Sequence, residues 1–236
     1  MDRKKFIRNG ILGIASLATA TKILESCSKS DNDDDGTDTS ADGSCTVSPS
    51  ETKGPFPIKT PSQLVLENIK SDRIGVALLI NLTIENQSKD CAPLEGVLVD
   101  VWHCDKDGNY SEYGGTTMQQ TDYTSVHFLR GRQTSDANGE VSFISIFPGW
   151  YQGRAPHIHV EVLSASGSSL LVTQIAFPEN VTSEVYSSTN YAAHGQADTS
   201  NTSDNVFSDS LSDELATLTG NLTDGYTLSK TITVKA

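Results

Sequence analysis

FPGWYQGRAPHIHVEV, residues Phe147 to Val162, is the stretch from which the fold of this 236-residue chain is most readily inferred. It opens with a Pro-Gly turn signal and continues into an alternating run that begins at His157. Successive side chains of a strand point to opposite faces. The odd-numbered residues from His157 to Glu161 therefore share one face, and the apolar even-numbered residues share the other, which is typical of a face that packs on a core.

His157 and His159, two of the five histidines, stand side by side on the polar face of this strand. Their β-carbons are expected about 7 Å apart, a workable separation for two neutral imidazole ligands of one metal ion. The alternative is a partly buried strand with two hydrogen-bonded histidines. Tyr151 and Tyr110, the latter in GNYSEYG, add two phenols. Phenolate oxygen favours a hard cation such as ferric iron over zinc.

Several motifs in combination resemble the intradiol ring-cleavage dioxygenases, and most closely their secreted, single-domain members. The resemblance extends from Cys45 to about Phe207. Its motifs are CTVSPSETKGPFPI, CAPLEGVLVDVWHCDKDGNYS, FLRGRQTSDANGEVSFISIFPGWYQGRAPHIHV, TQIAFPEN and DNVF.

The resemblance implies a non-haem Fe(III) ion held by two tyrosines and two histidines. These ligands fall on Tyr110, Tyr151, His157 and His159. The arginine three residues before the first histidine matches Arg154, and the glutamine of the next strand matches Gln174. The implied reaction is the insertion of O2 between the two hydroxyl-bearing carbons of a catechol, which gives a muconate-type dicarboxylic acid in aromatic compound catabolism. Tyr151 would leave the metal and act as base, and Arg154 would stabilise developing charge.

Two other classes compete with this interpretation. A non-catalytic β-sandwich surface lipoprotein that binds a small ligand or glycan would have no reason to keep all four ligands, and a zinc hydrolase lacks an obvious carboxylate base. Tyr113 and Tyr123 are rivals for Tyr110, which alone fits the family's G-x-Y pattern. Of the remaining histidines, His103 is expected to be packed or hydrogen-bonded. For His127 two interpretations stand equally, a supporting residue beside the site and a solvent-exposed side chain. No functional role is expected of His194.

Residues 1–27 resemble a bacterial lipoprotein signal peptide. A basic start precedes an apolar stretch too short to span a membrane, and Leu24-Glu25-Ser26-Cys27 resembles a lipobox, although Glu25 departs from it. An ordinary signal peptide is the alternative. Both predict export, and the lipobox predicts a lipid anchor on Cys27 at the cell envelope, on the periplasmic or the outer-surface side. Residues 28–44 are acidic and predict a disordered tether.

Residues 45–236 are expected to form one all-β domain, a β-sandwich of mostly antiparallel strands with long active-site loops. The expected strands are 76–84, 95–104, 140–146, 157–162, 170–177 and 228–235, with a turn or two of helix around 213–218. The net charge is −13 and no basic cluster occurs, which argues against nucleic acid as a partner. The partners expected are a catechol and O2, and the oligomeric state is left open.

With Cys27 assigned to lipid, Cys45, Cys91 and Cys104 form an odd set in an oxidising compartment. A bond between Cys91 and Cys104 is disfavoured because an extended strand of nine residues spans roughly 30 Å. Cys45 is free to pair with either one, which leaves one buried thiol.

Gln174 is expected directly opposite His159. If Leu163 pairs with Leu170 across a polar loop, the hairpin is antiparallel and paired residue numbers have a constant sum. A slip of one residue would send Gln174 to the other face, so this prediction depends on the register.

Overall fold

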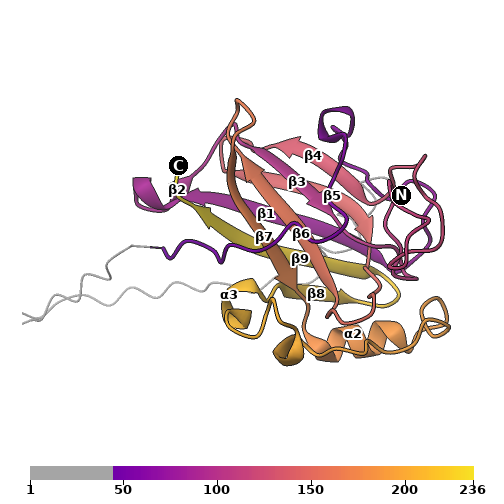
Figure 1. Cartoon of the computed structure of the whole chain (residues 1–236). Helices are drawn as coiled ribbons and strands as arrows, with labels where there is room; N and C mark the ends of the chain where they lie inside the picture. The colour runs from indigo at the N-terminus through magenta and orange to yellow at the C-terminus, as the bar shows by residue number, and fades with distance from the viewer. Residues whose placement is uncertain (1–44) are drawn as a thin grey trace, which may run out of the picture. The chain divides into compact units, whose positions relative to one another are not determined.

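The computed structural model describes residues 45–236, which fold into two β-sheets and a few short helices (Figure 1). The expected all-β sandwich of mostly antiparallel strands is confirmed. The signal peptide, the lipobox with Cys27 and the acidic tether lie outside the described residues. Among the described residues, no helix has the length and apolar character needed to cross a membrane.

The first sheet is built around the long central strand β1. Its strands are β1 (Ala77–Asn86), β2 (Ala92–Pro93), β5 (Glu140–Ile146), β8 (Thr217–Asn221) and β9 (Gly225–Val234). The order is β2-β1-β9-β8, and β5 also pairs with β1. Only the β1–β9 pairing is parallel in this sheet. Alternate side chains of β1 are buried, as expected of a strand with one face on the core.

The second sheet carries the histidine strand in its interior. Its strands are β4 (Arg130–Thr134), β3 (Leu98–Trp102), β6 (His157–Leu163) and β7 (Ser169–Ala176), in that order and all antiparallel. The even-numbered residues of β6 lie in the core between the sheets. The odd-numbered residues of β6 are buried as well, because loops cover the outer face of the sheet.

Helices are short and lie outside the two sheets. They are α2 (Glu179–Tyr186), α3 (Leu211–Glu214), η1 (Pro61–Gln63), η2 (Gln87–Lys89) and η3 (Asn201–Ser203). The helical turn expected around 213–218 is partly wrong. Helix α3 ends at Glu214, and β8 begins at Thr217 because that segment pairs with β9.

The predicted β6–β7 register is confirmed where it concerns the site, since His159 lies opposite Gln174. From His157 through Val162, the numbers of the residues paired across β6 and β7 have a constant sum, as predicted. The pairing assumed at the turn is wrong, because an irregularity after Val162 places Leu163 opposite Ser169. The slip falls beyond the site and leaves its face unchanged.

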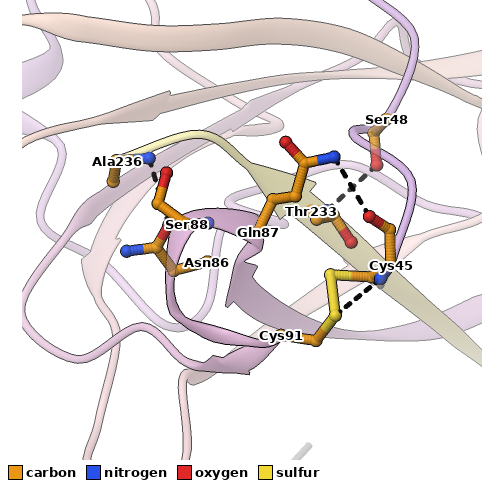
Figure 2. Close-up of a disulfide and its surroundings, with 8 residues drawn as sticks. All are labelled: Cys45, Ser48, Asn86, Gln87, Ser88, Cys91, Thr233 and Ala236. Carbon is orange, nitrogen blue, oxygen red and sulfur yellow. Dashed lines mark hydrogen bonds between the residues drawn. A yellow bond between two sulfur atoms is a disulfide. The ribbon is translucent and has the colours of Figure 1, made fainter. Parts of the chain in front are cut away.

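The structure resolves the cysteine pairing that the sequence left open. Cys45 bonds to Cys91, and Cys104 is a buried free thiol. Figure 2 shows this disulfide beside the end of β1, where Gln87 also donates a hydrogen bond to the Cys45 carbonyl. Near it the backbone N–H of Thr233 in β9 donates to the Ser48 hydroxyl, and the Ser48 N–H donates to the Thr233 carbonyl. These contacts attach the start of the domain to the first sheet.

Residues 45–58, here called the strap, run from this disulfide across the second sheet. In Figure 1 the indigo segment crosses β7 and β6. The Glu51 amide donates to the Val172 carbonyl, and the Thr52 carbonyl accepts from the side chain of Gln174. The strap therefore covers the face that carries the two histidines.

Candidate functional site: a buried tyrosine and histidine cluster

β6 brings the two histidine rings together, as the alternation predicts. The Nε2 atoms of His157 and His159 are 3.1 Å apart, and both rings are buried. Nδ1 of His157 lies 2.6 Å from the Ala155 carbonyl, which can only accept a hydrogen bond. The proton of His157 is therefore on Nδ1, and its Nε2 presents a lone pair to His159.

Tyr110 reaches the same point from the loop after β3. Its hydroxyl oxygen is 3.4 Å from Nε2 of His157, and the residue is fully buried. Gln119 fixes the loop, since its side chain accepts from the Tyr110 amide and donates to the Tyr110 carbonyl. Gly108 permits close approach, because a β-carbon there would lie 2.2 Å from the Trp150 carbonyl oxygen.

Tyr151 completes the predicted set from the segment before β6. The centre of its ring is 5.6 Å from that of His157 and 5.8 Å from that of Tyr110. Unlike Tyr110, Tyr151 is only partly buried. The sequence-predicted ligands thus lie together, three inside the protein and the fourth partly open to solvent.

The strap and β3 enclose these rings. Phe56 stacks on Tyr110 with ring centres 4.7 Å apart, and Trp102 stacks on His159 at 4.9 Å. Gly54 has a φ of +65°, and a β-carbon there would lie 2.9 Å from Cε1 of His159. Only glycine fits this contact without strain. The histidines are therefore covered by a segment that the sequence did not place over the site.

Arg154 and Gln174 also lie where the sequence predicts. The Arg154 guanidinium donates to Oε1 of Gln174 at 2.7 Å, and its Nη1 is 3.5 Å from the Tyr151 hydroxyl. Its Nε bonds to the Asp204 carboxylate at 2.8 Å. Asp204 is fully buried and also accepts from the Ala155 amide. An ordered network of hydrogen bonds therefore extends from β7 to the exposed edge of the cluster.

Burial controls the protonation states of the four rings. It lowers the pKa of His157 to about 3, with Arg154 as the next cause, and lowers the pKa of His159 well below its usual value. Both imidazoles are therefore neutral at physiological pH. Burial also raises the pKa of Tyr110 well above its usual value and raises that of Tyr151, although the Arg154 guanidinium opposes the shift at Tyr151.

This donor set fits a hard cation. Neutral imidazole nitrogens and a phenol oxygen converge within hydrogen-bond distance, and a buried Nε2 lone pair directed at a second imidazole is best satisfied by a metal ion between the rings. Among the described residues, no three His, Cys, Asp or Glu side chains group as metal ligands. The side chains gathered here are two histidines and two tyrosines. Phenolate ligation in a buried site requires a strongly charged ion, which favours Fe(III) over zinc.

A cavity of ≈ 420 Å³ opens beside the cluster. Its lining includes Tyr151 and Arg154, so it reaches the exposed side of the ligand set. The remaining lining residues are Thr52, Gly54, Pro55, Met118, Gln152, Gly153, Asn205 and Val206. The volume is suitable for a small aromatic molecule.

The other histidines lie away from the cluster. His103 is buried between the Cys104 carbonyl and the Ser145 hydroxyl, as the sequence predicts. Nδ1 of His127 lies 2.8 Å from Oε1 of Glu112, so this half-exposed ring does contact the loop that carries Tyr110. His194, of which nothing was expected, bonds to the carbonyl of Trp150.

The rival tyrosines serve other purposes. Tyr113 donates to the Pro57 carbonyl, and Tyr123 packs against Phe128. Sequence reasoning missed three supporting residues: Gln119, Arg130 and Asp204. Asp204 belongs to the quoted DNVF motif, but nothing in that motif indicates that Arg154 is its partner.

Comparisons with known proteins agree with the geometry. A dioxygenase family model, Dioxygenase_C, matches residues 56–208. A chlorocatechol 1,2-dioxygenase from Rhodococcus opacus is 28% identical over 149 residues, which are 53% of this chain and 54% of that protein. The chain thus matches only about half the length of this relative.

Solved structures extend the comparison. An intradiol ring-cleavage dioxygenase from Tetranychus urticae is 28% identical with a TM-score of 0.72, over 81% of this chain and 95% of that one. A 3-chlorocatechol 1,2-dioxygenase from Rhodococcus opacus is 23% identical with a TM-score of 0.57, over 83% and 75% of the two chains, and supports the fold alone.

Proposed function

Because the chain belongs to the intradiol ring-cleavage dioxygenase family, we propose that it cleaves a catechol between its two hydroxyl-bearing carbons with O2, using Fe(III). The product is a muconate-type dicarboxylic acid. The observation that carries this proposal is the convergence of the Tyr110 hydroxyl, the two imidazole nitrogens of β6 and the Tyr151 ring beside an open cavity.

Bound Fe(III) would supply a Lewis acid that favours the doubly deprotonated catechol and draws electron density from its ring. His157, His159 and Tyr110 are enclosed and would hold the ion as permanent ligands. Tyr151 lies at the cavity with its hydroxyl near Arg154, which supports its proposed role as the ligand that would give way to substrate and accept a proton from it.

Arg154 holds two roles at the rim of the site. Its pairing with Asp204 fixes the guanidinium, and its Nη1 faces the Tyr151 hydroxyl. A cation fixed in a partly desolvated position stabilises negative charge that develops on the ring or on the displaced tyrosine. Gln174 orients the guanidinium from β7.

A non-catalytic binding module remains the second candidate, and the site gives a specific reason against it. Two neutral imidazoles and two phenols with raised pKa values, three of the four side chains fully enclosed, have no use in a glycan site, which relies on exposed polar groups and flat aromatic surfaces. A zinc hydrolase is disfavoured because no carboxylate from residues 45–236 lines the cavity to act as base.

Oxygen consumption with product identification tests the proposed function. Iron-loaded protein is incubated with catechol, and O2 uptake is measured together with the product mass. The proposal predicts that one O2 is consumed per catechol. The product should be a colourless dicarboxylic acid that contains both atoms of that O2. A yellow semialdehyde, which forms when the ring opens beside the hydroxyl pair, or the absence of O2 uptake with iron bound, contradicts it. Tyr151→Phe removes the proposed base, so this variant should lose O2 uptake.

We also propose that the protein is exported and anchored at the cell envelope by lipid on Cys27. The Cys45–Cys91 disulfide supports an oxidising compartment. Cys27→Ser should move the protein from the membrane fraction to the soluble fraction without loss of activity, because stable anchoring requires several acyl chains. Wild-type protein found only in the soluble fraction contradicts the anchor.

A further inference from the structure

The cavity beside the ligand cluster is lined by more apolar side chains than charged ones. Pro55 from the strap, Met118 from the loop after Tyr110 and Val206 after η3 supply apolar surface. Within the part of the chain that the structure describes, Arg154 is the single charged lining residue. The remaining lining side chains are neutral.

Two of the three guanidinium nitrogens of Arg154 are already bonded inside the protein. Its Nε bonds to both oxygens of Asp204, at 2.8 and 3.1 Å, and its Nη2 bonds to Gln174. The Asp204 carboxylate is held in turn by the amides of Ala155 and Val206. Only Nη1 is left, and it faces the Tyr151 hydroxyl at 3.5 Å. An anionic ring substituent that points away from the ligand cluster would therefore meet no unpaired cation among the described residues of the lining.

The strap lysine offers no free cation to the cavity either. Lys53 pairs with Glu161 and lines a different cavity. A carboxylate that enters beside Arg154 therefore meets no unpaired lysine from the strap.

Met118 is held at the mouth by the residue beside it. Gln119 is buried and bonds to the backbone of Tyr110 and to the Tyr113 carbonyl. The Met118 side chain, 60% exposed, projects from this fixed point into the cavity lining. A flexible thioether adapts to apolar groups of different shapes.

We propose that this site selects uncharged catechols with an apolar ring substituent over catechols with a ring carboxylate, and that Met118 is a specificity-determining residue. The inference rests on the proposed function and names its substrate class. The apolar substituent packs between Met118, Pro55 and Val206, while the two hydroxyl groups face the ligand cluster. Exclusion of the carboxylate follows from the paired state of Arg154 and from the apolar surface of the other lining residues.

Equilibrium binding without oxygen tests this inference separately from turnover. Iron-loaded full-length protein is titrated by calorimetry with 4-tert-butylcatechol, with catechol and with 3,4-dihydroxybenzoate. We expect the carboxylate compound to bind at least about tenfold more weakly than 4-tert-butylcatechol, a difference of roughly 1.4 kcal/mol. Equal or tighter binding of 3,4-dihydroxybenzoate overturns the inference.

A charge introduced at Met118 sharpens the test. Met118→Lys should improve the binding of 3,4-dihydroxybenzoate relative to 4-tert-butylcatechol by about tenfold, because it places a cation at the cavity. Thr117→Lys is the matched control, since Thr117 is an exposed neighbour that does not line the cavity. If the affinity for 3,4-dihydroxybenzoate relative to 4-tert-butylcatechol is the same in both variants, the role of Met118 is refuted.

Turnover measured in parallel separates the two claims. If the binding order holds but no catechol is cleaved, the proposed dioxygenase activity fails while the specificity of the site stands. If catechols are cleaved and the carboxylate compound is preferred, the activity stands and the specificity inference is refuted.

Discussion

Two neighbouring rows of side chains cross the outer face of the second sheet and satisfy their polar groups in opposite ways. The first row, here called the ring row, is Arg130, Trp102, His159 and Gln174 on β4, β3, β6 and β7. The second, the charge row, is Arg132, Asp100, Glu161 and Val172 on the same strands. The two rows are one pleat apart, two residues along each strand.

Each charged side chain of the charge row has a partner of opposite charge within the protein. Arg132 bonds to both oxygens of Asp100, at 2.5 and 2.7 Å, and Lys53 of the strap pairs with Glu161 at 2.6 Å. Burial raises the pKa of Asp100 although Arg132 lowers it, so desolvation outweighs the attraction there. Such a cluster positions strands and strap and requires no added ion.

In the ring row, by contrast, the histidine has no charged partner within the described part of the protein. Its histidine is neutral, stacks on Trp102 and faces a second imidazole and a phenol. Arg130, fully buried, donates to the carbonyls of Phe56 and Ser111 and so holds the strap and the Tyr110 loop, not an acid of its own row. The comparison teaches that neutral buried donors that converge indicate a metal site, whereas paired charges indicate structure.

Removal of a proposed metal ligand from the ring row is expected to have the largest effect on iron binding and turnover. His159→Ala is expected to abolish iron binding and lower kcat/KM by at least about 1,000-fold, roughly 4 kcal/mol of transition-state stabilisation. Iron content and O2 uptake measure this. Glu161→Gln, two residues along β6, is the control and should retain iron. Equal iron loss in both variants would remove the distinction between the rows.

Arg132→Met tests the charge row. Asp100 is left buried without its partner, so the free energy of unfolding should fall by about 3 kcal/mol while iron content is unchanged. Asp100→Leu combined with Arg132→Met should recover most of that loss. A double variant as unstable as the single one would show that the pair itself stabilises the fold. Urea denaturation gives these values.

Gln174→Ala tests the outer end of the ring row. The variant loses the bond from Gln174 to Arg154 but no metal donor, so turnover should slow by about 10- to 100-fold with iron still bound. Metal analysis beside steady-state kinetics separates the two effects. Loss of iron would instead show that Gln174 supports the ligands through the Thr52 carbonyl.

Glu214 offers a smaller, pH-dependent contrast to the paired acids of the charge row. It is buried, one of its oxygens lacks a hydrogen-bond partner, and burial raises its pKa to about 7. The folded chain holds this proton more tightly than the unfolded chain, so the stabilisation is complete below the usual pKa and is lost as pH rises through about 7.

Glu214→Gln should therefore make the protein about 1 to 2 kcal/mol more stable than wild type at pH 8. The gain should disappear at pH 4. Thermal unfolding at the two pH values measures it, with Asp213→Asn as an exposed control on the same helix. A gain that is equal at both pH values would contradict the assigned pKa.

Local patterns were sufficient for much of this molecule. The alternation in β6 predicts that His157 and His159 share a face, and the hairpin sum places Gln174 opposite His159. The family motifs indicate Tyr110 and Tyr151. Each of these inferences needs only strand period or a short connection, which sequence carries directly.

Long-range contacts could not be predicted in this way. β4 contains Gly131 between two arginines and shows no apolar alternation, because one of its faces packs charges and the other packs closely on Ile69. The pairing of Arg154 with Asp204, fifty residues apart, leaves no local signal. Cysteine spacing does not determine connectivity, so the partner of Cys45 also required the structure.

The visible spectrum of purified protein, with metal analysis, tests the central claim most directly. Protein expressed with ample iron should contain one iron per chain and be red-brown, because phenolate-to-Fe(III) charge transfer absorbs broadly in the visible range. Tyr110→Phe should shift or abolish that band. A colourless wild-type protein that carries stoichiometric zinc would contradict the account.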